Sequence, residues 1–278
     1  MERIERCLAE GGSDYLAGIL RAAGQAALQA GSVLAGLYHQ PHQVRYKGRI
    51  DLVTEADVAA EKIIIDLLSA RYPQIAILSE ESHAAYSYIP QEPVWVIDPL
   101  DGTTNFAHGF PWFAVSIGFM EKGRVLVGVI HAPLRDELFC ACKGYGAWLN
   151  GEKIAVSKAE KLLHSLLATG FPYNITEQAD GVLAALKKVL TRSQGVRRAG
   201  AAALDLAYVA CGRLDGFWEI NLKPWDTAAG LLLVEEAGGR VTDFRGRPYS
   251  PFVPEVVSSN GLIHEELATL LRESAIVT

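Results

Sequence analysis

One segment of the N-terminal half constrains the fold more than any other. The apolar run 94–97 has the composition of a buried strand, and it leads directly into Asp98, Pro99 and Asp101. Because Pro99 lacks a backbone N–H, we expect the strand to end there and the chain to turn until Asp101 faces the same point as Asp98. Gly102 and two threonines follow, and we expect them to begin a helical turn with free backbone N–H groups. The fold must therefore bring a strand end, two carboxylates and a helix start to one point.

The rest of the chain alternates between helical and strand patterns. Helices are predicted over 15–38 and 54–70, with Thr54 as the cap of the second, and further strands over 75–78, 113–120 and 125–131. Lys122-Gly123 and Asn150-Gly151 are typical of hairpin turns. The second half predicts helices over 177–190, 201–210, 227–237 and 262–272 and strands over 216–220, 240–243 and 255–258. This alternation favours an α/β fold. We expect one domain over 1–278, with sub-structures of about 1–150 and 151–278 and a site between them.

Composition limits the classes of function. Of the 278 residues, 50% are hydrophobic, which is enough to bury a substantial core. A formal net charge of −6 gives no general attraction to nucleic acid, so we expect no nucleic-acid partner. The four cysteines lack a paired C-x-x-C spacing, which is typical of a reducing compartment, and Cys140 and Cys142 are expected on one face of a buried strand. No apolar signal core and no run of about 18 apolar residues is present, so we expect a cytoplasmic protein without membrane contact.

The two aspartates after the first strand suit a metal ion. Carboxylate oxygens are the ligands that Mg²⁺ prefers in proteins. The backbone amides of Gly102 and Thr103 would lie beside them and bind an anion such as a phosphate. The alternative is that Asp98 and Asp101 only form hydrogen-bonded turns after a strand.

The other acidic candidates have structural alternatives as well. Asp57 lies three residues after Thr54 and could serve only the helix N-terminus, as in a capping box. The pair Glu80-Glu81 could be solvated, and Asp226 is predicted at the cap position of a helix. Glu219 interrupts an apolar strand, so it either faces solvent or binds a polar group, because burying an unpaired carboxylate is costly.

Taken together, these segments resemble the inositol monophosphatase family of lithium-sensitive, magnesium-dependent phosphatases. The order and the separations match along nearly the whole chain. The residues that carry the resemblance are Asp51, Leu52, Val53, Thr54 and Asp57; Ser79, Glu80, Glu81 and Ser82; the run from Trp95 to Phe106; and Trp225, Asp226, Ala228, Ala229 and Gly230.

This resemblance implies a layered αβαβα sandwich of the sugar phosphatase type that holds two or three Mg²⁺ ions. Glu80, Asp98 and the backbone carbonyl of Leu100 would hold one ion. Asp98, Asp101 and Asp226 would hold the second, so that Asp98 bridges the two.

The resemblance also implies a mechanism. A third, weaker ion would depend on Glu80, with the loop that carries Lys47 closing over it. A metal-activated water would attack phosphorus without a covalent enzyme intermediate. It would be helped by Thr103 with Asp57 behind it, or by Glu80, and the choice between these bases stays open. The amides of Gly102 and Thr103 would stabilise the phosphoryl oxygens.

Substrate contacts follow from the same resemblance. The implied substrate-binding residues are Glu80, Leu100, Asp101, Gly102, Thr103, Gly200, Ala201, Ala202, Glu219 and Asp226. Position 201 is Ala where many relatives have Ser or Thr, which puts a hydroxyl contact there in doubt. Lys223, Arg197 and Arg198 are the candidates for contact with a second phosphate, and the alternative for Lys223 is a solvated surface side chain.

The function that the resemblance implies is that of a phosphoric monoester hydrolase acting on inositol-1-phosphate. The alternative is a fructose-1,6-bisphosphatase, or a bifunctional enzyme for both substrates, because the metal motifs do not separate activities hosted by one scaffold. A regulatory protein that associates with transcription machinery, as some bacterial relatives do, is a different class. The family also suggests a homodimer.

Overall fold

Alternate residues of strand β4 (Val94–Asp101) lie in two different hydrophobic cores. Trp95 and Ile97 pack with the helices α1 (Glu2–Leu8), α2 (Asp14–Leu37) and α3 (Glu55–Arg71). Val94 and Val96 pack on the other side, with α6 (Ala202–Ala210) and α7 (Pro224–Glu236). Because successive side chains of a strand point to opposite faces, this sheet is covered by helices on both sides.

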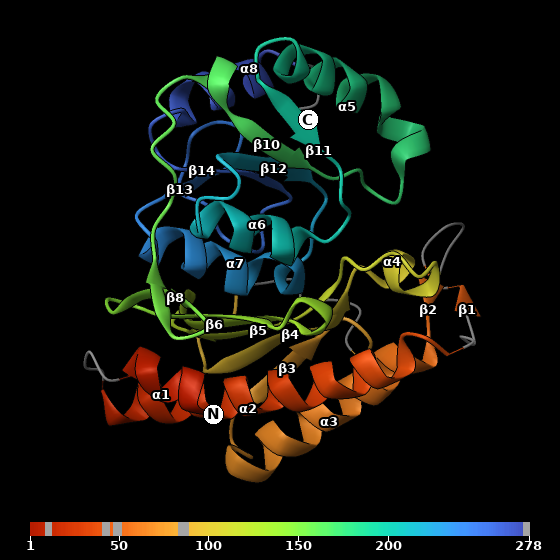
Figure 1. Ribbon diagram of the computed structural model, residues 1–278, viewed down its shortest axis with the longest axis vertical. Helices are drawn as coiled ribbons and strands as arrows, with labels where there is room; N and C mark the ends of the chain where they lie inside the picture. Colours follow the sequence, from red (N-terminus) through yellow and green to blue (C-terminus); the bar gives the residue numbers. More distant parts are fainter. Residues whose placement is uncertain (9–12, 41–44, 47–51, 83–88, 275–278) are drawn as a thin grey trace.

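The computed structural model describes residues 1–8, 13–40, 45–46, 52–82 and 89–274, so Lys47 and Asp51 lie outside the described residues. Two sheets and three helical layers alternate in it, helix–sheet–helix–sheet–helix (Figure 1). A third core joins α5 (Ile175–Leu190) and α8 (His264–Arg272) to the outer face of the second sheet. This arrangement confirms the α/β fold that the sequence pattern predicts and the layered sandwich that the family resemblance implies.

The first sheet has the strand order β3-β4-β5-β6-β7-β8-β9; β3 and β4 are parallel, and the later neighbours are antiparallel. The second sheet has the order β11-β10-β12-β14-β13. The remaining strands of the two sheets are β3 (Ala76–Ser79), β5 (Ala114–Glu121), β6 (Arg124–Ala132), β7 (Glu137–Cys142), β8 (Gly146–Leu149), β9 (Glu152–Ile154), β10 (Leu166–Thr169), β11 (Gly195–Arg197), β12 (Gly216–Ile220), β13 (Arg240–Thr242) and β14 (Glu255–Ser259). The shorter elements are β1 (Arg45–Tyr46), β2 (Leu52–Val53), α4 (Thr103–Ala107), η1 (Pro133–Arg135) and η2 (Leu162–His164).

Most elements appear where their patterns predict them, and two predictions are wrong. Strand β4 does not end at Pro99 but runs on to Asp101, with a register shift against β5 between Asp98 and Asp101. An irregularity of this kind tolerates a proline because its ladder hydrogen bond is already interrupted. Helix α7 begins at Pro224, and Lys223 is its N-cap, so Asp226 lies in the first turn rather than at the cap. The hairpins at Lys122-Gly123 and Asn150-Gly151 are confirmed, with positive φ at all four residues.

Helix α7 packs unusually close to the first sheet. Gly118 of β5 and Gly128 of β6 are directly opposite each other in the ladder. A methyl group at Gly118 would come within 2.9 Å of the Ala228 Cβ atom, and one at Gly128 within 2.7 Å of the Ala229 carbonyl oxygen. The two glycines thus set the distance between the helix and the sheet.

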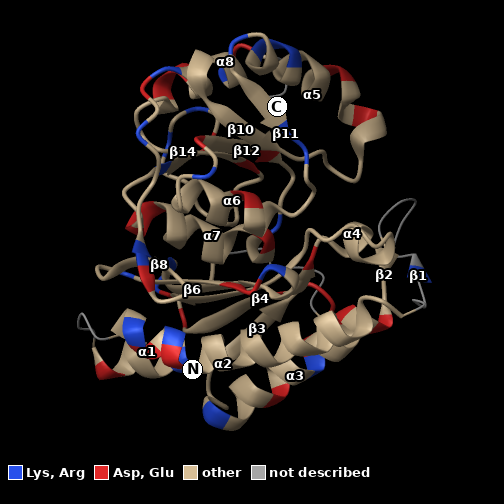
Figure 2. Cartoon of the chain, viewed as in Figure 1, with Lys and Arg blue, Asp and Glu red and all other residues tan. Residues whose placement is uncertain are grey.

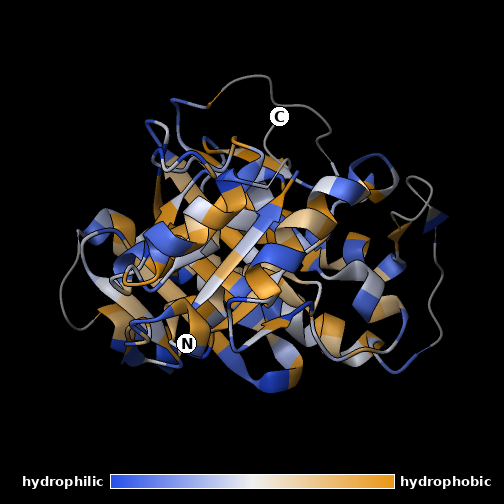
Figure 3. Ribbon diagram, turned by 90° about the horizontal axis from the view of Figure 1, so that it is seen from above, coloured by the Kyte–Doolittle hydropathy of each residue, from blue (hydrophilic) through white to orange (hydrophobic). Residues whose placement is uncertain are grey.

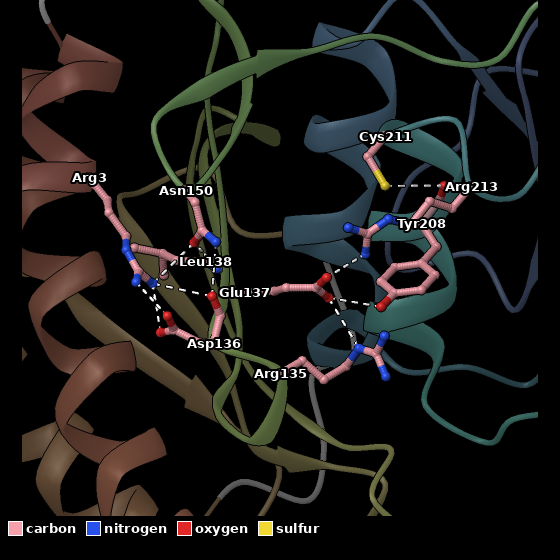
Figure 4. Close-up of polar contacts among 9 residues, drawn as sticks. All are labelled: Arg3, Arg135, Asp136, Glu137, Leu138, Asn150, Tyr208, Cys211 and Arg213. Carbon is pink, nitrogen blue, oxygen red and sulfur yellow. Dashed lines mark hydrogen bonds and ion pairs between the residues drawn. The ribbon is translucent and has the colours of Figure 1, made fainter.

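Helix α6 is attached to the same sheet by a polar cluster around Glu137, at the start of β7. Its carboxylate accepts hydrogen bonds from Tyr208 Oη at 2.8 Å, from Arg213 Nη1 at 2.5 Å and from Arg135 Nε at 3.3 Å (Figure 4). The Arg213 guanidinium also lies over the Tyr208 ring. These contacts fix the C-terminal end of α6.

The outer helices carry both hydrophilic and hydrophobic stretches (Figure 3). In α5, the buried residues Val182, Ala185 and Val189 recur at helical spacing and face the second sheet. No helix within the described ranges is both long and apolar enough to cross a bilayer.

Candidate active site

A cleft of about 850 Å³ opens where β4, α4, α6, α7 and β12 converge. Figure 2 shows acidic segments around the junction of β4, α6 and α7. The predicted site residues that line this cleft are Glu80, Asp98, Leu100, Asp101, Gly102, Thr103, Gly200, Ala201, Ala202, Glu219 and Asp226. Lys223 and Arg198 line it too, whereas Arg197 is exposed on β11 and is not part of the lining. Residues from both halves of the chain therefore meet in one cleft.

Asp98 and Asp101 are both buried at the end of β4, and each has a structural hydrogen bond. Asp98 Oδ1 accepts from the backbone N–H of Leu100 at 3.0 Å, as expected for a turn-forming aspartate. Asp101 Oδ2 accepts from the backbone N–H of Ala203 at 2.7 Å, in the first turn of α6. The second contact fixes the start of α6 against the strand.

The raised pKa values of these two aspartates are not explained by a turn-forming role alone. Burial, and then the charges of Glu80, Asp101 and Asp226, hold the pKa of Asp98 well above its ordinary value. Burial raises the pKa of Asp101 to about 7, against the lowering effect of the Ala203 amide. Carboxylates that repel one another in a buried site need either protons or a cation for stability.

The donor set fits Mg²⁺ in chemistry and in charge, because it consists of carboxylate oxygens. Within the described residues, however, no group of three or more His, Cys, Asp or Glu side chains is arranged to hold a metal ion. The carboxylates would have to draw together around an ion. The predicted ligand set therefore stays a prediction.

Asp57 lies at the start of α3 and, unlike the other predicted catalytic residues, does not line the cleft. Its Oδ2 accepts from Thr54 N at 2.8 Å and from Thr54 Oγ1 at 2.6 Å; the first of these bonds, together with the Asp57 backbone N–H that donates to the Thr54 hydroxyl, forms the capping box. Its Oδ1 accepts from Thr103 Oγ1 at 2.9 Å. Thr103 Oγ1 also contacts the carbonyl oxygen of Leu100 at 3.1 Å. Asp57 thus caps its own helix and contacts a residue of the cleft through its other oxygen.

Gly102 is the N-cap of α4 and has φ +98°. A Cβ atom there would come within 2.9 Å of the Trp112 carbonyl oxygen. The helical turn predicted at this position is confirmed, and only glycine combines this backbone conformation with this close approach.

Glu219 is partly buried on β12 and lines the cleft. Burial and the charges of Asp205 and Asp226 raise its pKa, and Arg198 opposes them. A methyl group at Gly170 would overlap the Glu219 carboxylate, so this glycine makes room for it.

Asp205 is a residue that sequence reasoning missed. It is fully buried in α6, and its Oδ1 has no hydrogen-bond partner within the described part of the chain. Its position as the single charged residue of an otherwise apolar helix could have identified it from the sequence as a buried carboxylate.

Comparison with known proteins supports one family. A model of the inositol monophosphatase family matches residues 16–275. The Nus factor SuhB of Escherichia coli K12 is 45% identical over 257 residues, which cover 92% of this chain and 96% of that protein. An inositol-1-monophosphatase of Synechocystis is 45% identical over 253 residues, 91% of this chain and 88% of that protein.

Two solved structures agree with this result. The inositol monophosphatase from Anabaena superposes with a TM-score of 0.85 at 42% identity and covers 95% of this chain and 98% of that one. The extragenic suppressor protein suhB from Bartonella henselae has a TM-score of 0.87 at 42% identity, over 92% of this chain and 99% of that one. The chain therefore belongs to the inositol monophosphatase family.

Proposed function

We propose that this protein is a Mg²⁺-dependent phosphatase that hydrolyses inositol-1-phosphate to inositol and phosphate. The observation that carries the proposal is the convergence of Glu80, Asp98, Asp101 and Asp226 on one cleft, beside the start of α4. Phosphatase activity on a small phosphorylated molecule follows from the family. The named substrate and the named metal are our inference.

The metal would be held by Glu80, Asp98, the Leu100 carbonyl, Asp101 and Asp226. When bound, Mg²⁺ supplies positive charge that stabilises the phosphoryl oxygens and makes water more acidic. The amides of Gly102 and Thr103 would hold a further phosphate oxygen.

The chain's own proton acceptor would be Asp57, acting through Thr103. The Thr103 hydroxyl already donates to Asp57 Oδ1, so it can accept a proton from water and pass its own to the carboxylate. Glu80 is the alternative base, because it also lines the cleft. Glu219 would accept hydrogen bonds from the inositol hydroxyls.

The test is phosphate release from a panel of inositol-1-phosphate, fructose-1,6-bisphosphate, histidinol phosphate and adenosine 3′,5′-bisphosphate, with Mg²⁺ and with a chelator. We expect metal-dependent turnover that is fastest with inositol-1-phosphate and is inhibited by Li⁺. Turnover that continues in the chelator would rule the proposal out.

Fructose-1,6-bisphosphate is the second candidate substrate. Arg198 and Lys223 line the cleft and offer positive charge to a second phosphate group. If this substrate is used, Lys223→Ala should impair its turnover more than that of inositol-1-phosphate.

A regulatory role is the candidate from another class, since several relatives at 45–46% identity carry the name Nus factor SuhB. RNA polymerase that co-purifies with the tag-free protein at low salt would support it. The homodimer that the resemblance suggests is tested by light scattering on the purified protein.

A further inference from the structure

We propose that Glu61 is a positioning residue that holds the Glu80 segment in the geometry needed for metal binding. Glu61 lies in α3, and its Oε1 accepts two hydrogen bonds, from Ser79 Oγ at 2.6 Å and from Ser82 Oγ at 2.7 Å. Such short distances are typical of hydroxyl groups that donate to a carboxylate. This inference rests on the proposed function, because it gives Glu61 a part in binding the ion.

The two serines lie at the two ends of the segment that carries Glu80. Ser79 is the last residue of β3, and Ser82 follows three residues later. One carboxylate oxygen therefore ties both ends of a four-residue turn. Ser79 is fully buried and Glu61 is 8% exposed, so little water competes for the hydrogen bond between them, whereas Ser82 is exposed.

The same segment is also fixed to the strand that carries Asp98. Ser79 pairs with Ile97 in the parallel ladder, and the backbone N–H of Glu80 donates to the Ile97 carbonyl oxygen at 3.2 Å. Asp98 is the next residue. The backbone contact sets the position of the segment along β4, and Glu61 holds the turn closed.

Helix α3 serves two parts of the site from one face. Asp57 and Glu61 are four residues apart, which places their side chains one above the other on a helix. Asp57 accepts from Thr103, and Glu61 accepts from the two serines beside Glu80. A single helix face thus sets the relative position of Thr103 and Glu80.

A merely structural Glu61 would make a different prediction. Loss of a buried acceptor for two hydroxyl groups lowers stability in either case. Only a positioning role also weakens metal binding in protein that remains folded. Partners behind metal ligands typically change metal affinity by about 10- to 100-fold when they are lost.

The experiment uses the full chain with Glu61→Ala, Glu61→Gln and Ser82→Ala, and with Asp66→Asn as the matched control. Asp66 lies on the same helix in an exposed pair with Lys62, outside the cleft. Binding of Mn²⁺, followed by its electron paramagnetic resonance signal, gives the affinity without turnover. The Mg²⁺ concentration for half-maximal phosphate release and urea unfolding in chelator complete the set.

We expect Glu61→Ala to weaken Mn²⁺ binding about 10-fold or more. Glu61→Gln should recover most of this loss, because its amide oxygen still accepts from both serines. Ser82→Ala keeps the fully buried hydrogen bond of Ser79 and should lose about 3-fold. It keeps the inference testable if Glu61→Ala does not fold. Asp66→Asn should bind like the parent.

Metal affinity that is unchanged in Glu61→Ala, or in Ser82→Ala if Glu61→Ala does not fold, would overturn the inference. In that case the parent would still bind metal and release phosphate, so the proposed function would stand. A parent protein that neither binds Mn²⁺ nor turns over the panel would overturn both.

Discussion

Replacing Asp57 with asparagine separates two roles that one carboxylate combines. Oδ2 accepts two hydrogen bonds from Thr54, and Oδ1 accepts one from Thr103. Asparagine has a single acceptor oxygen. When that oxygen faces Thr54, the cap is kept and an NH₂ donor faces the Thr103 hydroxyl. The change therefore removes the proton acceptor behind Thr103 and leaves the helix start nearly intact.

The cost to folding should be moderate, and the protein should remain folded. Loss of a whole N-cap costs about 0.5–2 kcal/mol, and loss of one hydrogen bond to a charged group costs about 1.5–3 kcal/mol. We expect Asp57→Asn to lower the free energy of unfolding by about 2 kcal/mol, against a total of roughly 5–15 kcal/mol for a folded protein. The rate should fall by about 10²–10⁴-fold, as for loss of a general base.

Two measurements separate these effects: phosphate release from inositol-1-phosphate at saturating Mg²⁺, and urea unfolding in chelator. Thr54→Ala is the control, because it damages the cap and keeps the hydrogen bond between Thr103 and Asp57. We expect it to lose similar stability and little activity. If both variants lose activity equally at equal stability, Asp57 acts only as a cap and the reasoning is refuted.

Three further predictions follow from the site and the core. Asp98→Asn should abolish phosphate release. It should also raise the urea midpoint of unfolding of the metal-free protein, measured in chelator at pH 8, because it removes a buried charge that its neighbours repel. Near-normal turnover would contradict this prediction. Gly170→Ala should displace the Glu219 carboxylate and raise KM for inositol-1-phosphate about 10- to 100-fold, the cost of one hydrogen bond to a charged group; an unchanged KM would argue against Glu219 as a substrate contact. His264 is fully buried between Ser259 and Thr242, and burial lowers its pKa to about 4. The unfolded state therefore takes up a proton between about pH 6.5 and pH 4 that the folded state does not, so stability falls as the pH is lowered. Relative to His264→Gln, the parent should lose about 3 kcal/mol of unfolding free energy between pH 7 and pH 4 in urea titrations; a constant difference would refute it.

Local sequence patterns were sufficient to predict most helices and strands and most of the residues that line the cleft. Period-2 and period-3.6 alternation located the long helices and the strands of the first sheet, and the order of the acidic motifs predicted residues that the cleft does bring together. The short strands β10 and β11 were not predicted from the sequence, although β3 and β13, which are equally short, were. The prediction that β4 ends at Pro99 was wrong because a register shift lets the strand continue, and only the pairing with β5 reveals that shift.

Contacts between distant residues were beyond the sequence. Glu61 and Ser79 are 18 positions apart, and their contact depends on how α3 packs against the first sheet. The local sequence alone left Glu219 between facing solvent and binding a polar group; the family resemblance assigned it to the site, and in the structure it lines the cleft. Which base takes the proton stays a prediction.

The glycine pair beneath α7 has a consequence for engineering. Asp226 lies two residues before Ala228, so the height of this helix above Gly118 and Gly128 also sets the height of the carboxylate. A methyl group at either glycine would push α7 away from the sheet. The distance between Asp226 and the carboxylates of β4 would then change, although the sequence of every motif would be unchanged. Any redesign of the cleft for bulkier phosphate esters must therefore keep glycine at these two positions.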